Sequence, residues 1–127
     1  MQIDTCHFEI HVHSLEAAQV FYVDKLGFEL IQFKPELHLL AVKAGTVRIS
    51  IFADASQQDV AAAGRAGGHI IFRTHKLSAT IEALQSAGID VPRVSEAPGF
   101  MKYISLRDPS GNLLEIAEYM RDPLKDD

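Results

Sequence analysis

The chain has 127 residues, of which 47% are hydrophobic and 23% charged, and its formal net charge at pH 7 is −5. These values are ordinary for one soluble globular domain. The acidic balance leaves no basic stripe for nucleic acid, and no apolar run reaches the roughly 18 residues of a membrane helix. We therefore expect no nucleic-acid or membrane partner and, since the N-terminus has no signal-peptide layout, a cytoplasmic protein.

The single cysteine, Cys6, excludes an intrachain disulfide and fits a reducing compartment. Residues 5–13 alternate between apolar and polar side chains, which is the pattern of a strand with one apolar face. Cys6 falls on that apolar face with Phe8, so we expect a small buried side chain and not a nucleophile. His7 and Glu9 fall on the polar face.

The rest of the first half is predicted to be one helix and three strands. Ser14 is a plausible N-cap for a helix that Gly27 ends. The three strands are expected over residues 28–34, 37–44 and 46–53. Gly45 and Thr46 form the hairpin turn between the last two of them.

The second half repeats the first with an offset of 62 residues, the difference between His69 and His7. In this superposition His75 also falls on His13. We predict a strand over 67–74, a helix that starts at His75 or Ser78, and three more strands. These strands are expected over residues 89–94, 99–108 and 112–120, with a turn at Asp108–Asn112.

These elements predict an α+β fold of two βαβββ modules. Each module has one helix and an open sheet, so two modules side by side would form a cupped mixed sheet around a metal or substrate cleft. We expect one domain over residues 1–127. Its predicted parts are module one at about 1–56, a linker at 57–67 and module two at about 68–120.

The repeat places His7 and His69 at equivalent positions on the polar strand faces. Glu115 lies in the last strand between Leu114 and Ile116, which point to the core, so it shares the polar face. Two imidazoles and a carboxylate suit one divalent ion of Fe, Mn, Ni, Zn or Co and leave coordination positions open. Solvated histidines and a surface carboxylate are the alternative interpretation.

Several segments give the chain a clear resemblance to the vicinal oxygen chelate superfamily, which includes glyoxalase I, bleomycin-resistance proteins and extradiol dioxygenases. They cover almost the whole chain in the family's order. The matching segments are His7, Ser14–Glu16, Phe21–Tyr22, Leu26–Phe28, Gly68–Phe72 and Asp108–Glu115.

The resemblance implies that His7, His69 and Glu115 are metal ligands. A fourth family position aligns with Ser50, where glyoxalase-like members usually carry Glu or Gln. A His-His-Glu set instead resembles the extradiol dioxygenases and the fosfomycin-resistance thiol transferases. Neither matches fully: Ser105 stands where the extradiol enzymes have a tyrosine, and Glu9 stands where the fosfomycin enzymes have a threonine. Lyase, isomerase and dioxygenase chemistry therefore all stay open.

Other polar side chains share the predicted cleft face. Glu9 is the candidate general base, because it is two residues from His7. Arg73 could hold a carboxylate or phosphate of the substrate, or it could pair with Glu9 or Glu118. The remaining candidates for substrate binding are Tyr103, Ser50 and Ser105.

A second hypothesis is a metal-free, bleomycin-resistance-like protein that sequesters a small molecule or antibiotic without turning it over. Under either hypothesis the partner is a small molecule. The resemblance also implies a homodimer, in which His7 of one chain could meet His69 and Glu115 of the other if the modules are swapped.

Overall fold

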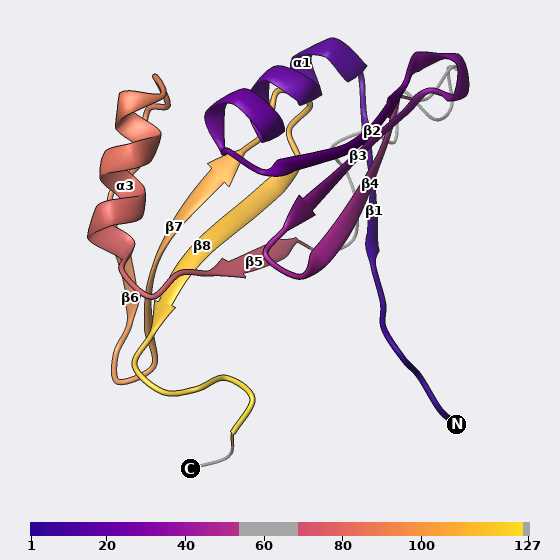
Figure 1. Cartoon of the computed structure of the whole chain (residues 1–127). Coiled ribbons are helices and arrows are strands. Elements are labelled where there is room, and N and C mark those ends of the chain that lie inside the picture. Colours follow the sequence, from indigo (N-terminus) through magenta and orange to yellow (C-terminus); the bar gives the residue numbers. More distant parts are fainter. Residues whose placement is uncertain (54–68, 126–127) are drawn as a thin grey trace. The chain divides into compact units, whose positions relative to one another are not determined.

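The computed structural model describes residues 1–53 and 69–125, drawn in Figure 1. It forms two compact units. One unit contains the elements that precede residue 54 together with Asp108–Asn112, and the other contains the elements from Ile70 onward without that segment. The predicted linker at 57–67 lies outside the described residues. Over the described ranges, no helix is both long and apolar enough to cross a membrane.

The first unit contains a four-stranded mixed sheet in the order β1-β4-β3-β2. β1 runs parallel to β4, and the other neighbours are antiparallel. The tight turn at Gly45, whose φ is 60°, joins β3 to β4 as predicted. The strands are β1 (Phe8–Val12), β2 (Glu29–Lys34), β3 (Leu39–Ala44) and β4 (Val47–Ala53).

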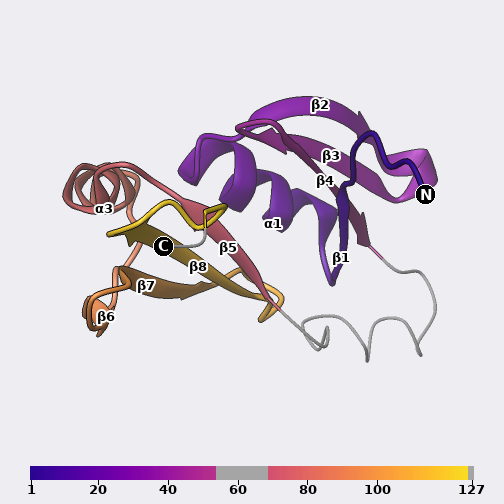
Figure 2. The same ribbon diagram turned by 90° about the horizontal axis from the view of Figure 1, so that it is seen from below.

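The helix of the first unit starts as predicted and then widens. In α1 (Leu15–Gln19), Ser14 caps the first turn because its Oγ accepts a hydrogen bond of 3.2 Å from the Ala17 amide. Residues Val20–Lys25 continue as a π-helix. The chain leaves this helix at Gly27, whose φ is 77°. α1 packs on β3 and β4, and Figure 2 shows it lying beside that sheet.

The two faces of this sheet differ in character. Ile10, Leu40 and Ile51 share one rung, meaning that they lie directly opposite one another on neighbouring strands, and all three are buried. This face packs against the helix, whose side chains of Leu15, Phe21 and Tyr22 are buried. Because side chains alternate along a strand, Glu9, His11, Arg48 and Ser50 occupy the opposite face.

The second unit repeats this plan with the strand order β5-β8-β7-β6. β5 is parallel to β8, and the remaining pairs are antiparallel. The helix α3 (Leu77–Ser86) packs on β8. The strands are β5 (Ile70–Arg73), β6 (Ser95–Ala97), β7 (Met101–Arg107) and β8 (Leu113–Tyr119). The predicted α+β class with two βαβββ modules is confirmed.

Two sequence-based predictions are wrong. Cys6 is exposed, because β1 starts only at Phe8 and its pairing with β4 starts at Phe8 and Ile49. The alternating sequence pattern starts before the paired part of β1, so no neighbouring strand covers Cys6. Residues 89–94 form no strand, and β6 starts at Ser95 instead. Pro92 has no amide hydrogen to donate to a ladder, which explains why pairing starts after it.

The turn Asp108–Asn112 is held by a network of side-chain hydrogen bonds. The buried Asp108 carboxylate accepts bonds from the Ser110 and Asn112 amides, each 2.9 Å, and from Asn112 Nδ2, also 2.9 Å. The Tyr22 hydroxyl donates a fourth bond of 2.7 Å. Asn112 Nδ2 also donates to the His11 carbonyl at 2.9 Å. The turn is thereby fastened to both β1 and the helix.

Removing one of these donors should destabilise the chain measurably. We expect Tyr22→Phe to lower the free energy of unfolding by about 1.5–3 kcal/mol, because the bond lost is a buried one to a charged acceptor. Urea denaturation followed by circular dichroism measures it. Tyr119→Phe is the matched control, with an expected change within about 0.5 kcal/mol. Equal effects of the two substitutions would contradict the assigned role of the Tyr22 hydroxyl.

The same contact makes stability sensitive to alkaline pH. Burial raises the pKa of Tyr22 above its ordinary value of 10.0, and the charge of Asp108 and the bond to it raise the pKa further. Above about pH 10 the unfolded chain loses a proton that the folded chain keeps, so the free energy of unfolding falls as pH rises. In urea titrations between pH 9 and 11 we expect Tyr22→Phe to show a shallower decline than Tyr119→Phe. An equally steep fall of the free energy of unfolding in the two variants would refute this role of Tyr22.

Candidate functional site

The two sheets carry equivalent rungs on the faces opposite their helices. Ser50 of β4 lies between Glu9 and Ala41 in the first sheet. Glu115 of β8 lies between Ile71 and Ser105 in the second. Ser50 and Glu115 therefore occupy the same place in the two modules, and their strand neighbours Glu9 and Ile71 are separated by the 62-residue offset of the repeat. The same scaffold position carries a neutral hydroxyl in one module and a carboxylate in the other.

In the second unit the structure brings two predicted metal ligands together. His69 Nε2 is in direct contact with Glu115 Oε1. The Glu115 side chain is 11% exposed, whereas the His69 side chain is 36% exposed. The parallel pairing of β5 with β8 produces this contact, because it aligns the residue after His69 with Leu114. An imidazole nitrogen and a carboxylate oxygen side by side are a suitable donor pair for a divalent transition metal.

His7 belongs to the first unit, where it precedes β1 and is exposed. Over residues 1–53 and 69–125, no group of three or more His, Cys, Asp or Glu side chains is arranged to hold a metal ion. The structure thus assembles the His69–Glu115 pair within one unit. The membership of His7 in the same site stays a prediction based on the repeat.

Most of the other predicted residues lie on the expected faces. Glu9 Oε2 is 3.3 Å from His11 Nε2 on β1. Arg73 Nη1 is 3.9 Å from Asp122 Oδ1 within the second unit. Tyr103 is half-buried, and Ser105 is exposed directly opposite Glu115.

One interaction on the polar face of the first sheet was not predicted. Arg48 Nε donates a hydrogen bond of 3.2 Å to Ser50 Oγ. Ser50 is 5% exposed, and Arg48 is half-buried above it. The i, i+2 spacing on one strand puts both residues on the same face, which is the only signal for this pair in the sequence. The bond itself depends on the rotamer of a long side chain, which no spacing reveals.

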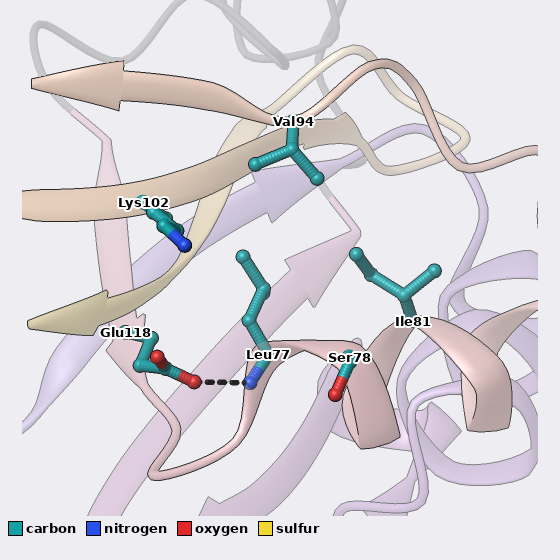
Figure 3. Close-up of a pocket in the computed structure, with 6 residues that line it drawn as sticks. All are labelled: Leu77, Ser78, Ile81, Val94, Lys102 and Glu118. Carbon is teal, nitrogen blue, oxygen red and sulfur yellow. Dashed lines mark hydrogen bonds between the residues drawn. The ribbon is translucent and has the colours of Figure 1, made fainter.

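A cavity of about 290 Å³ lies in the second unit, on the sheet face that carries α3. In Figure 3 the Glu118 carboxylate accepts a hydrogen bond of 2.8 Å from the Leu77 amide and so caps α3, whose N-cap residue provides no side-chain bond. Glu118 and Glu115 lie on opposite faces of β8, so the cavity is separate from the His69–Glu115 pair. It is lined by Leu77, Ser78, Ile81, Val94, Lys102 and Glu118.

Comparison with known proteins identifies one family. The model described as Glyoxalase/Bleomycin resistance protein/Dioxygenase superfamily matches residues 6–116, which include the predicted ligands and both units. No curated protein matches the sequence.

Solved structures of similar length have the same fold. A glyoxalase/bleomycin resistance protein/dioxygenase from Alicyclobacillus acidocaldarius is 21% identical, with 97% of this chain and 96% of that one covered and a TM-score of 0.74. Lactoylglutathione lyase from Agrobacterium tumefaciens is 22% identical, with coverages of 92% and 95% and a TM-score of 0.71. At these identities the likeness concerns the fold alone.

A third structure has a function stated in its description. TnmS3, an antibiotic binding protein from Streptomyces sp. CB03234, is 25% identical to this chain. The match covers 94% of this chain and 98% of that protein, with a TM-score of 0.74. Proteins described as an enzyme and as an antibiotic binder thus share this backbone.

Proposed function

This chain belongs to the glyoxalase/bleomycin resistance protein/dioxygenase superfamily, and from that membership we propose that it is a metal-dependent enzyme acting on a small molecule. One divalent ion of Fe, Mn, Ni, Zn or Co is held by His7, His69 and Glu115. The substrate presents two neighbouring oxygens to it. The active protein is a cytoplasmic homodimer of one domain per chain, with the modules and linker at the boundaries expected from the sequence.

The contact between His69 and Glu115 carries this proposal. Burial of a carboxylate is costly unless a cation or hydrogen-bond donor faces it, and His69 is the partner that the structure provides for Glu115. The same nitrogen and oxygen are the atoms that would coordinate a metal. The donor set of two imidazoles and one carboxylate fits the proposed ions, and it leaves positions open for the substrate.

A bound divalent ion would act as a Lewis acid that stabilises enolate-like charge on the substrate, a need common to lyase, isomerase and dioxygenase chemistry. Glu9 is the proposed general base for moving a substrate proton. Arg73, Tyr103, Ser50 and Ser105 are proposed to bind and orient the substrate. These residues lie on the sheet faces opposite the helices, as Glu115 does.

The second candidate function is metal-free sequestration of a small molecule or antibiotic. The likeness to the antibiotic binding protein TnmS3, at 25% identity over most of both chains, favours it. Ser50 is also compatible with sequestration. It occupies the place that Glu115 has in the other module, and a hydroxyl contributes less to metal binding than a carboxylate does.

Metal content distinguishes the two functions. We expect about one equivalent of metal per chain in the purified, untagged protein, and we expect Glu115→Gln to weaken metal binding at least tenfold because it removes an anionic ligand. Inductively coupled plasma mass spectrometry gives the content, and competition with a chelator gives the affinity. Glu96→Gln, an exposed substitution in β6 of the same unit, is the matched control and should retain the metal.

Two outcomes would count against the enzyme. Protein that contains no metal and takes none up on titration would leave sequestration as the better proposal. Full metal occupancy in the Glu115→Gln protein would show that the ion binds elsewhere. Circular dichroism of each variant establishes that it is folded.

A further inference from the structure

Two cations face each other on the polar face of the first sheet. Lys43 and Arg48 are directly opposite across β3 and β4, next to the hairpin turn. Like charges in this relation destabilise a sheet. Among the described residues, neither side chain forms an ion pair, and the one hydrogen bond of the Arg48 side chain goes to a neutral hydroxyl. The pair is therefore a local excess of positive charge in a chain whose net charge is −5.

The nearest acids do not neutralise Arg48. Glu9 pairs with Ser50, one rung from Arg48 on the same sheet face. Its Oε2 atom lies 3.3 Å from Nε2 of His11, which is one rung further from Arg48. Glu29 of β2 is opposite Lys43, and the strand β3 separates it from Arg48 on β4. Arg48 thus has a positive neighbour across the strand and no acid beside it on its own rung.

The bond to Ser50 fixes the Arg48 side chain in a useful orientation. Arg48 donates through Nε, which leaves the two terminal nitrogens of the guanidinium for another acceptor. A guanidinium tethered in this way loses less rotamer freedom when it binds a ligand. The Ser50 hydroxyl accepts the Arg48 bond and still carries a proton that it can donate.

We propose that Arg48, Ser50 and Lys43 form an oxyanion subsite that binds a carboxylate or phosphate group of the substrate. The inference rests on the proposed function, since it assumes that the substrate occupies this face. It names the substrate class: a small molecule with an anionic group, in addition to the two oxygens that face the metal. Where the second module carries the carboxylate of Glu115, the first module carries donors and positive charge, so the two equivalent places have opposite electrostatic preferences.

Binding of inorganic phosphate and of acetate tests the subsite directly. Each anion is titrated, at constant ionic strength with chloride as the background ion, into the metal-loaded protein. The shifts of the Arg48 Nε–H resonance in ¹H–¹⁵N spectra measure its affinity. We expect saturable shifts with at least one of the anions, and the tighter binder identifies the group. Arg48→Gln should weaken binding about tenfold or more, because it removes a charged hydrogen-bond donor. Lys43→Gln should weaken it less.

The controls remove the same charges elsewhere. Arg93→Gln, in the exposed segment between α3 and β6, matches Arg48→Gln, and Lys102→Gln, on the α3 face of the second sheet, matches Lys43→Gln. Both controls should bind the anions as the parent protein does. Absence of a saturable shift with either anion would overturn the proposal. Backbone amide shifts give the anion affinity of each variant. An affinity that is unchanged in Arg48→Gln, or that falls equally in the controls, would also overturn the proposal.

Metal content separates this inference from the proposed function. Arg48→Gln should retain the metal equivalent of the parent protein, because Arg48 is not a proposed ligand. Loss of metal in this variant would show that Arg48 supports the metal site and would overturn the separate subsite. If the parent protein takes up no metal and still binds phosphate or acetate through Arg48, the enzyme proposal fails, while the oxyanion subsite stands as part of a sequestration site.

Discussion

The buried carboxylate of Asp108 is the constraint on which the first unit depends. A buried charge is unfavourable unless it is well hydrogen-bonded, and Asp108 accepts four bonds from two peptide amides, one side-chain amide and one phenol. Through Tyr22 the carboxylate holds the helix in place. Through Asn112, which also binds the His11 carbonyl, it positions the end of β1. The strand that carries Glu9 is thereby hydrogen-bonded to this turn near its C-terminal end.

Duplication gave the chain two equivalent scaffolds, and the chemistry now differs between them. The rung that carries Ser50 in the first sheet carries Glu115 in the second. Both residues are nearly inaccessible, yet one bonds to a guanidinium and the other contacts an imidazole. Backbone pairing therefore determines where a functional side chain can stand, and the identity of the residue determines which charge it attracts.

Periodicity and turn residues predicted the fold well because they report local energetics. Ser14 and Gly27 mark the ends of the first helix for physical reasons that operate within a few residues. The strand pattern failed at Cys6, since the burial of a strand end depends on where its partner strand starts. The repeat predicted His69 as a ligand and the strand pattern predicted Glu115, and the structure places these two side chains in contact. The Arg48–Ser50 bond and the Asp108 network were not predicted, because they depend on side-chain rotamers and on contacts between residues far apart in sequence.

The Asp108 turn also has a consequence for how the polypeptide is made. Its bonds to Tyr22, to the His13 amide and to the His11 carbonyl join residues separated by 86, 97 and 101 positions. The amino-terminal half therefore leaves the ribosome with these groups bonded only to water, and seconds pass before the turn has been synthesised. Contacts of such separation slow folding, because a long loop must close before they form. Until then the apolar face of the first sheet cannot be held in its native packing, and the nascent first half is exposed to aggregation.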